Sequence, residues 1–524
     1  MQQSGAAVHR PERCFAEELA DCRATRESGI AYFAESHLSK GISRRRVLKD
    51  IAAAAIFAPA VLGAARAWGA AALPTLPNLA ASEALLLLST DGDFAKYEPA
   101  YNQRTMLLPQ LRALCKTPNA VAVMIDWART NMLPFALRSG GHSYEGFSQS
   151  TSVVIDTRLM NKVEIDTAGG SVTVGAGASL GDIYKQIGAK GFALPAGSCP
   201  TVGVSGHALG GGFGLLARPL GLACDSLQSV ELVDPQGRIV TADPQQQPDL
   251  FWACRGGGGG SFGAATGFRF KLHPIGQVVT FGVDWSLNPA QAAKVMKAWQ
   301  AWAPHAPSAI TSIFRMGKRK DGSINVHCAG QSIGSLAQVR QELKVLLNIE
   351  QPDAVPRIKS RTFLDAVDYF SGGWDYESTY SKCKSDYVLS PLGDDAIATL
   401  IDGLRRLPAN AIVPICDAYG GAVAAIAPDA SAFARRAGTL YCIQYYSSWE
   451  AAADTPIHLT RMRDLYASMR PYVSGAAYVN YCDLELADWA DAYWGANLAR
   501  LKQVKAAFDP DNVFRHAQSV PVTG

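Results

Sequence analysis

Two glycine-rich clusters restrict what this chain can fold into more than any other feature of its sequence. The first reads RSGGHSYEGFS over Arg138–Ser148, and the second reads GSCPTVGVSGHALGGGFG over Gly197–Gly214. Each contains one reactive side chain, His142 or Cys199. Glycine permits positive φ and lets backbone N–H groups approach a flat or anionic ligand closely. Tight turns would explain either cluster alone, but the pair predicts two separate loops around one large, phosphate-bearing cofactor.

Both clusters resemble motifs of the berberine bridge enzyme-like oxidases, which belong to the vanillyl-alcohol-oxidase superfamily of flavoproteins. The resemblance continues through LFWACRGGGGGSFG (Leu250–Gly263), YVNYCD (Tyr478–Asp483) and WGANLARLKQVKAAFDPDNVF (Trp494–Phe514), and then Gln518-Ser519. It covers residues 97–275 and 476–520, and it is weak between them.

The resemblance implies FAD held by two covalent bonds. In the family, the His of the first motif bonds the flavin 8α-methyl carbon and the Cys of the second bonds ring carbon 6. These bonds are thereby assigned to His142 and Cys199. The same resemblance implies further cofactor contacts from Arg138, Ser139, Gly140, Gly141, Ser143, Ser198, Thr201, Val202, Gly203, Gly206, His207, Gly212, Tyr478 and Asn480.

The fold class implied by the resemblance is α+β. Residues 97–275 would form an FAD-binding domain of the PCMH type, and residues 276–475 a substrate domain with an antiparallel sheet covered by helices. Residues 476–520 would form the berberine-bridge-type segment that returns to the FAD domain.

Residue patterns predict individual elements of this fold. Before residue 276, apolar spacing predicts a helix at 120–131 and strands at 134–138, 152–156 and 171–175. Beyond it, core-facing and water-facing residues alternate at 278–287, 310–316 and 323–331, which favours an antiparallel sheet. A helix is expected at 290–302.

Two other motifs fit less well. Gly175, Gly177 and Gly181 nearly form a dinucleotide fingerprint, but the last spacing is one residue too long, which argues against NAD. Gly203–His207 resembles a nucleophile elbow, but its fifth residue is His rather than Gly and no apolar strand precedes it. A hydrolase is therefore disfavoured.

The front of the chain has the form of an export signal over residues 1–67. Ser43–Lys49 (SRRRVLK) is a twin-arginine motif, Ile51–Ala65 is a charge-free apolar run, and Ala65-Arg66-Ala67 is a small-x-small cleavage site. The alternative is a buried amphipathic helix, but the run has no polar face. We expect a periplasmic or secreted protein.

Charge and hydropathy exclude two classes of partner. Cleavage after Ala67 would leave 39 basic (49 − 10) and 39 acidic (46 − 7) residues, so the mature chain would be neutral. A neutral chain offers no electrostatic case for nucleic acid. No apolar window is long enough to span a bilayer. We expect a monomer whose partners are a small-molecule substrate and dioxygen.

The eleven cysteines do not suggest a metal site. Cys14 and Cys22 lie in the predicted signal region, and the other nine show no CxxC or CxxxC spacing. No metal is therefore expected. Apart from Cys199, we expect mostly buried thiols.

Oxidation of an alcohol by flavin needs a base for the hydroxyl proton. As a strand, Tyr478-x-Asn480-Tyr481 would place Tyr478 and Asn480 on one face and Tyr481 on the other. In the family the Tyr after Asn commonly serves as base, which assigns that role to Tyr481. Free Tyr has a pKa of about 10, so Tyr481 needs help. By resemblance to sugar-oxidising relatives we assign the helper role to Asp417; a turn residue before two glycines is the alternative.

The strand predicted at Tyr441–Trp449 supplies a further candidate, Gln444, which could contact substrate or be an ordinary strand residue. Alkaloid- and cannabinoid-forming relatives have Glu where this chain has Cys442, which disfavours their cyclisation chemistry. In relatives, Val at the position of Val202 is typical of oxidases and Leu of dehydrogenases.

The expected function is a secreted FAD-dependent oxidase that takes hydride from an alcohol or hemiacetal carbon and reduces dioxygen to hydrogen peroxide. C1 of a sugar or oligosaccharide is the first expectation for that carbon. The alternatives are oxidation of a secondary-metabolite hydroxyl with the same residues, and a catalytically idle flavin-binding protein.

Overall fold

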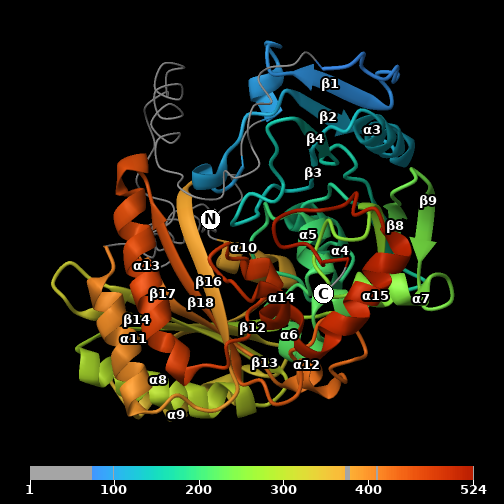
Figure 1. Ribbon diagram of the computed structural model, residues 1–524. Coiled ribbons are helices and arrows are strands. Elements are labelled where there is room, and N and C mark those ends of the chain that lie inside the picture. Colours follow the sequence, from blue (N-terminus) through green and yellow to red (C-terminus); the bar gives the residue numbers. More distant parts are fainter. Residues whose placement is uncertain (1–72, 98–99, 372–377, 409–410, 523–524) are drawn as a thin grey trace, which may run out of the picture. The chain divides into compact units, whose positions relative to one another are not determined.

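The structure of the protein is a computed structural model that describes residues 73–97, 100–371, 378–408 and 411–522. The predicted twin-arginine region, residues 1–67, lies outside the described residues. The described part contains sheets of four, five and seven strands and one two-stranded ladder (Figure 1). Among these residues, no helix combines the length and apolarity that a membrane span requires.

The four-stranded sheet leads into the first glycine cluster. Its order is β1 (Ala84–Leu88), β2 (Leu111–Cys115), β4 (Val153–Asp156) and β3 (Phe135–Arg138). Strands β2, β4 and β3 are parallel, and β1 is antiparallel to β2. Helix α3 (Pro118–Thr130) shares a core with this sheet and begins at Thr117, whose side chain accepts from the Ala120 N–H. The cluster therefore starts where a buried parallel strand ends.

The five-stranded sheet is antiparallel and flanks the second glycine cluster. Its order is β5 (Val163–Asp166), β6 (Ser171–Gly175), β10 (Ala264–Lys271), β8 (Leu227–Val233) and β9 (Ile239–Ala242). The short ladder pairs β7 (Phe192–Ala193) with β11 (His273–Pro274). The helices between these strands are α4 (Leu180–Gly188), α5 (Val204–Leu209), α6 (Ala217–Leu220) and α7 (Pro248–Ala253).

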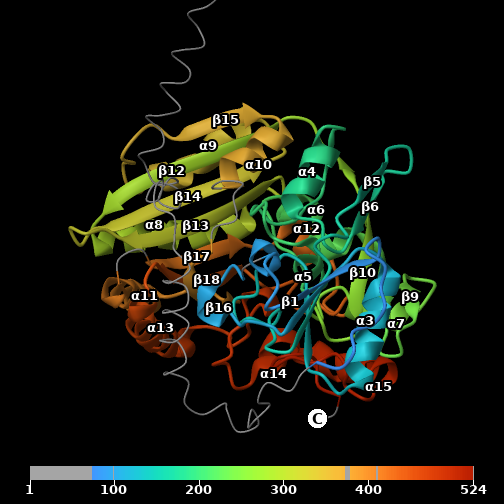
Figure 2. The same ribbon diagram turned by 90° about the horizontal axis from the view of Figure 1, so that it is seen from above.

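The seven-stranded sheet is antiparallel throughout (Figure 2). Its order is β15 (Arg357–Arg361), β12 (Val278–Leu287), β14 (Ile324–Ser332), β13 (Ile310–Lys318), β17 (Ala411–Ala418), β18 (Tyr441–Trp449) and β16 (Tyr380–Val388). Alternate residues of its central strands, such as Phe281, Phe314 and Ile443, enter one hydrophobic core.

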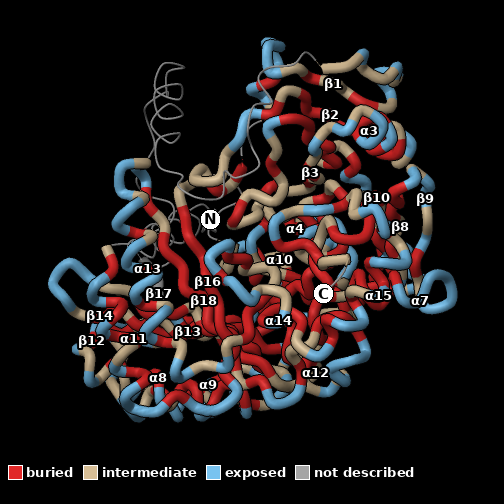
Figure 3. Tube along the Cα trace, viewed as in Figure 1, coloured by how far each residue is buried: buried red, intermediate tan, exposed pale blue. Residues whose placement is uncertain are grey.

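Four helices cover that apolar face of the sheet: α8 (Pro289–Trp302), α9 (Leu336–Leu347), α11 (Asp394–Arg406) and α13 (Thr455–Met469). Two short helices, α10 (Phe363–Ser371) and α12 (Gly421–Ala425), lie elsewhere in this part of the chain. The sheet strands are buried along most of their length (Figure 3). The opposite face carries Asp417 and Gln444, which are both buried, so other parts of the protein cover these two residues.

The C-terminal helices α14 (Trp489–Trp494) and α15 (Leu498–Phe508) pack into the core built around the five-stranded sheet. Tyr493, Trp494 and Leu501 lie in the same cluster as Leu250 and Phe251 of α7. The end of the chain therefore returns to the part that holds both glycine clusters.

The expected α+β fold is confirmed, with an antiparallel sheet covered by helices after residue 276. The predicted strands at 171–175, 278–287 and 441–449 are observed without change, and the other predicted elements shift by a few residues at their ends. One predicted strand is wrong: the backbone over Val479–Tyr481 forms a 3₁₀ turn.

Candidate active site

The two glycine clusters lie directly against each other. A Cβ atom added to Gly140 would overlap the backbone nitrogen of Gly203, and one added to Gly203 would overlap that of Gly140. Only glycine at both positions allows this contact. The structure thus joins the two loops into one backbone surface.

Positive charge gathers beneath the first cluster. Arg112, Arg138 and Arg158 all approach a single buried carboxylate, Asp156, at 3.4, 3.5 and 2.8 Å. Their charges exceed that of Asp156, so the potential under the loop favours an anion. A Cβ on Gly141 would overlap the Arg138 guanidinium. Arg138 therefore packs directly against the loop at Gly141.

His142 stands on the first loop as a half-buried, neutral imidazole. Burial and then the charge of Arg138 lower the pKa of His142 to about 4. The ring of Tyr101 stacks on the imidazole with centroids 4.4 Å apart. At neutral pH the ring is therefore in its nucleophilic, uncharged form.

Cys199 is exposed, whereas the other eight described cysteines are buried, and all nine are free thiols. Although Cys199 is exposed at the surface of its loop, desolvation by the surrounding protein raises the pKa of the thiol. The nearby positive charge of Arg315 opposes that rise. The peptide of Gly197 holds the loop: its N–H donates to His207 Nε2 at 2.9 Å, and its carbonyl accepts from the Tyr184 hydroxyl at 2.7 Å.

His207 acts here as an acceptor within the protein. Burial lowers the pKa of His207 to about 4, so its ring is neutral and Nε2 can accept the Gly197 N–H. The contact is close, since a Cβ on Gly197 or on Gly212 would crowd the imidazole. His207 therefore shapes the loop that carries Cys199.

Two predicted cofactor ligands use their hydroxyls inside the protein. Ser139 donates to the Ala176 carbonyl at 2.7 Å, and Ser143 accepts from the Phe147 N–H at 3.0 Å. Both bonds stabilise the shape of the loops.

Four other residues of the second cluster were predicted to contact the cofactor: Ser198, Thr201, Val202 and Gly206. The Val202 N–H donates to the Cys199 carbonyl at 3.3 Å, which closes a turn. Thr201 hydrogen bonds His142 through its backbone, which links the second loop to the first. Val202 and Ser198 are half-buried and Gly206 is exposed.

Tyr478 and Asn480 fasten the C-terminal segment to the second cluster. The Tyr478 hydroxyl accepts from the Gly212 N–H at 2.8 Å and from Asn480 Nδ2 at 3.0 Å. Asn480 Nδ2 also donates to the His207 carbonyl at 3.0 Å. These bonds require a turn, which explains why the strand expected from the Tyr-x-Asn-Tyr pattern does not form.

Tyr481 and Asp417 form a hydrogen-bonded pair at the junction of the C-terminal segment and the seven-stranded sheet. The Tyr481 hydroxyl donates to Asp417 Oδ2 at 3.0 Å. Burial raises the pKa of Asp417 to about 7, while the Tyr481 hydrogen bond and the charge of Arg315 lower it. Burial and then the Asp417 charge hold the pKa of Tyr481 well above its usual value.

Gln444 lies beside this pair on strand β18. Its Nε2 donates to the Tyr144 hydroxyl at 3.0 Å and to the Cys383 sulfur at 3.2 Å. The ring of Tyr144 meets the rings of Tyr446 and Tyr481 edge to face, with centroids 6.1 and 6.2 Å away. All three predicted catalytic residues are therefore gathered at one place, among tyrosines.

Three residues of this region escaped the sequence analysis. Tyr144 stands within the first cluster but was not singled out, and Tyr101 belongs to no motif. Arg315 is exposed, between core residues Phe314 and Met316 on β13. A charged residue alternating with core residues in a strand is the one signal that could have drawn attention to Arg315.

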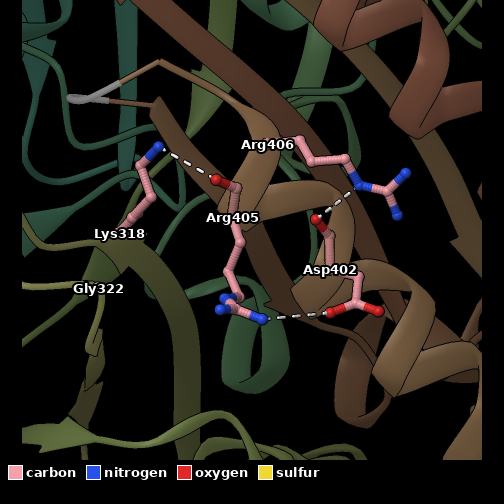
Figure 4. A pocket seen from close by; sticks show the side chains of 5 residues that line it. All are labelled: Lys318, Gly322, Asp402, Arg405 and Arg406. Carbon is pink, nitrogen blue, oxygen red and sulfur yellow. Dashed lines mark hydrogen bonds and ion pairs between the residues drawn. The ribbon is translucent and has the colours of Figure 1, made fainter.

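A surface hollow at the end of β13 is not part of this site (Figure 4). Its cationic side chains already have partners: Lys318 Nζ and Arg406 Nε donate to backbone carbonyls of α11 at 3.1 Å each, and Arg405 pairs with Asp402 at 3.7 Å. Lys318 thereby caps the helix end. Across the described residues, no group of three or more His, Cys, Asp or Glu side chains could hold a metal ion.

Two family models match this chain. The model described as FAD binding domain matches residues 109–243, and the model described as berberine and berberine like matches residues 477–521. The first match contains both glycine clusters, and the second contains Tyr478, Asn480 and Tyr481.

Individual proteins resemble the chain over most of its length. The uncharacterised FAD-linked oxidoreductase YgaK of Bacillus subtilis is 33% identical over 82% of this chain and 95% of its own length. The monolignol oxidoreductase AtBBE-like 13 of Arabidopsis thaliana is 32% identical over 85% and 89%. The solved structure of BBE-like 1 from Physcomitrella patens superposes with a TM-score of 0.79 at 29% identity, covering 85% of this chain and 98% of that one.

Proposed function

This chain belongs to the berberine bridge enzyme-like family of FAD-linked oxidoreductases, and from that premise we propose that it oxidises C1 of a sugar or oligosaccharide with dioxygen as the electron acceptor. The hydrogen bond between Tyr481 and Asp417 carries this proposal. It supplies a way to remove the hydroxyl proton of the substrate.

The residues present fit FAD. The Gly140–Gly203 contact creates a backbone surface that any Cβ would disrupt, and the arginines around Asp156 favour an anionic group such as a pyrophosphate. When bound, FAD supplies the two-electron acceptor for the hydride that leaves the substrate carbon. Neutral His142 and exposed Cys199 stand on the two loops that would hold it.

We further propose that His142 and Cys199 both bond FAD covalently. Acid-precipitated protein should stay yellow, and its peptides should carry flavin mass at both positions. His142→Ala and Cys199→Ala should each leave one bond, and the double variant should release all flavin. Free FAD from acid-treated wild type would contradict the proposal.

Tyr481 and Asp417 act as a relay for the hydroxyl proton. As the substrate proton reaches the Tyr481 oxygen, the phenol proton moves to Asp417. Tyr481 therefore never has to carry a full negative charge. A carboxyl group whose pKa is about 7 can both accept and release that proton near neutrality. The positive charge of Arg315 stabilises the ionised carboxylate that must be present beforehand.

The decisive experiment is a peroxide-release screen over mono- and oligosaccharides and aromatic alcohols. We expect peroxide with reducing sugars and lactone as the organic product. Peroxide with aromatic alcohols alone would contradict the sugar assignment. Flavin that no substrate reduces would instead indicate an idle flavin-binding protein.

An aromatic alcohol is the second candidate substrate. The Arabidopsis relative is named as a monolignol oxidoreductase, and the rings of Tyr144, Tyr446 and Tyr481 would offer edges and faces to an aromatic ring. Coniferyl-type alcohols in the same screen test this candidate.

We also propose twin-arginine export to the periplasm or the medium, on the basis of Ser43–Lys49. Replacing Arg44 and Arg45 with Lys should retain the precursor in the cytoplasm with its flavin. Normal export of that variant would contradict the proposal.

A further inference from the structure

Tyr101 contacts the first glycine loop through both its backbone and its ring. Its N–H donates to the Gly141 carbonyl at 3.1 Å, immediately before His142, and its carbonyl accepts from the Thr379 N–H at 2.9 Å. Its ring lies on the His142 imidazole at 4.4 Å with an angle of 20° between the planes. The loop and the imidazole are therefore fixed by the same residue.

The segment that carries Tyr101 is itself held in place. The next residue, Asn102, is fully buried, and its Nδ2 donates to the carbonyls of Tyr144 and Ser381 at 2.7 and 3.0 Å. Its Oδ1 accepts from the Ser381 N–H at 3.0 Å. The backbone of Tyr101 is thus held between the first glycine cluster and strand β16, which fixes the point from which its ring reaches His142.

The hydroxyl of Tyr101 connects this residue to the group of tyrosines around Gln444, where we expect the substrate to bind. A hydrogen bond joins it to the hydroxyl of Tyr446 on β18, whose ring in turn meets Tyr144. One tyrosine therefore touches both the candidate tether residue and the aromatic group around Gln444.

We propose that Tyr101 is a positioning residue that sets the imidazole of His142 at the angle needed for its bond to FAD. This role rests on the proposed His142 tether. Bond formation joins an imidazole nitrogen to the flavin 8α-methyl carbon and breaks one N–H and one C–H bond. The methyl carbon is oxidised by two electrons, the electrons and both hydrogens stay on the flavin ring, and dioxygen removes them as hydrogen peroxide. Misplacement of the attacking ring by about 1 Å slows such a step by ~10²-fold.

The test separates the two tethers. In a Cys199→Ala background His142 is the remaining attachment point, and in a His142→Ala background Cys199 is. Freshly purified protein is supplied with FAD in air, and acid-stable flavin is followed over time. Tyr101→Leu should slow attachment about 10- to 100-fold in the first background and leave it unchanged in the second. Tyr101→Phe keeps the stacked ring and should attach at the parent rate. Tyr97→Leu, a nearby tyrosine that stacks on Arg158 instead, is the matched control and should have no effect.

Two results would overturn the role of Tyr101: an unchanged rate for Tyr101→Leu in the Cys199→Ala background, or equal slowing in both backgrounds. Absence of acid-stable flavin in Cys199→Ala with Tyr101 intact would overturn the His142 tether itself, and the role of Tyr101 with it.

Discussion

At the scale of single residues, the proposed chemistry depends on a buried carboxylate, Asp417, beside the phenol of Tyr481. Free tyrosine is ionised to about one part in a thousand at pH 7, and burial lowers that fraction further for Tyr481. In the relay we propose, Asp417 accepts the phenol proton at the moment the phenol accepts one from substrate. The nearby charge of Arg315 lowers the pKa of Asp417 and so favours the ionised carboxylate that this relay needs.

Removing the Tyr481 hydroxyl should therefore slow the reaction without disturbing the fold. We expect Tyr481→Phe to lower the rate of flavin reduction by substrate by about 10²–10⁴-fold, the usual contribution of a positioned base. Anaerobic stopped-flow mixing measures this rate, and flavin content should match wild type. If reduction were unaffected, the base would have to be Asp417 acting directly.

The pH dependence of kcat/KM should report Asp417. The relay needs the ionised carboxylate, so activity should rise with pH and level off above the Asp417 pKa of about 7. Asp417→Asn should lower the plateau and abolish this rise. Asp386, whose pKa burial also raises to about 7, lies on the helix-covered side of β16 and pairs with Arg470. Asp386→Asn is the matched control and should preserve the rise; its loss there would contradict the assignment.

At the scale of elements, the site is formed by the two glycine-rich loops and the 3₁₀ turn at Val479–Tyr481. The loops meet at Gly140 and Gly203, and the turn is fastened to the second loop by Tyr478 and Asn480. The first contact is made by backbone, and the second by the Tyr478 hydroxyl and the Asn480 amide. Because this surface is densely packed, adding one methylene group there forces neighbouring atoms to move.

Val202 provides a test of that tightness. It closes the turn after Cys199 and packs half-buried against the core of the flavin-binding part. In oxidases of the family the matching side chain borders the space where dioxygen reacts, and we propose the same for Val202. Val202→Leu should therefore slow reoxidation of reduced flavin at unchanged reduction by substrate. Stopped-flow mixing with oxygenated buffer decides. A wild type that reoxidises slowly but reduces a quinone readily would be a dehydrogenase.

At the scale of the described protein, a buried ion network ties three distant segments together. Lys382 of β16 contacts Glu145 of the first cluster and Asp483 of the C-terminal segment, at 2.5 and 2.6 Å. Lys384 also reaches Asp483, and Arg104 reaches Glu145. Each charge in this network contacts at least one opposite charge, so losing one member leaves a buried charge without its partner and costs much more than the intact network.

Lys382→Met should accordingly destabilise the protein by about 3–5 kcal/mol, because it leaves buried carboxylates short of a partner. The denaturation midpoint in guanidinium chloride measures this loss. Lys297→Met breaks an exposed pair with Asp394 and should cost less than about 1 kcal/mol. Equal midpoints for the two variants would show that the network does not join the segments energetically.

Much of the site could be predicted from local sequence. Positions where the backbone must approach another group closely are occupied by glycine. The loops around His142 and Cys199 were therefore recognisable from the sequence alone. Period-two alternation likewise predicted the antiparallel sheet, since one face of each strand had to be apolar. These signals are local because each depends on residues within a few positions of one another.

The partnerships across the site were decided by tertiary structure. Asp417 precedes Tyr481 by 64 residues, and nothing in either local sequence specifies the other. The Tyr-x-Asn-Tyr pattern suggested a strand, but hydrogen bonds from Gly212 and to His207 impose a turn. Sequence alone determined which groups could react and on which loops they stand. Only the packing of the seven-stranded sheet against those loops decided which proton acceptor, which charge and which ring each group would face, because these contacts are made between segments that meet only in the folded chain.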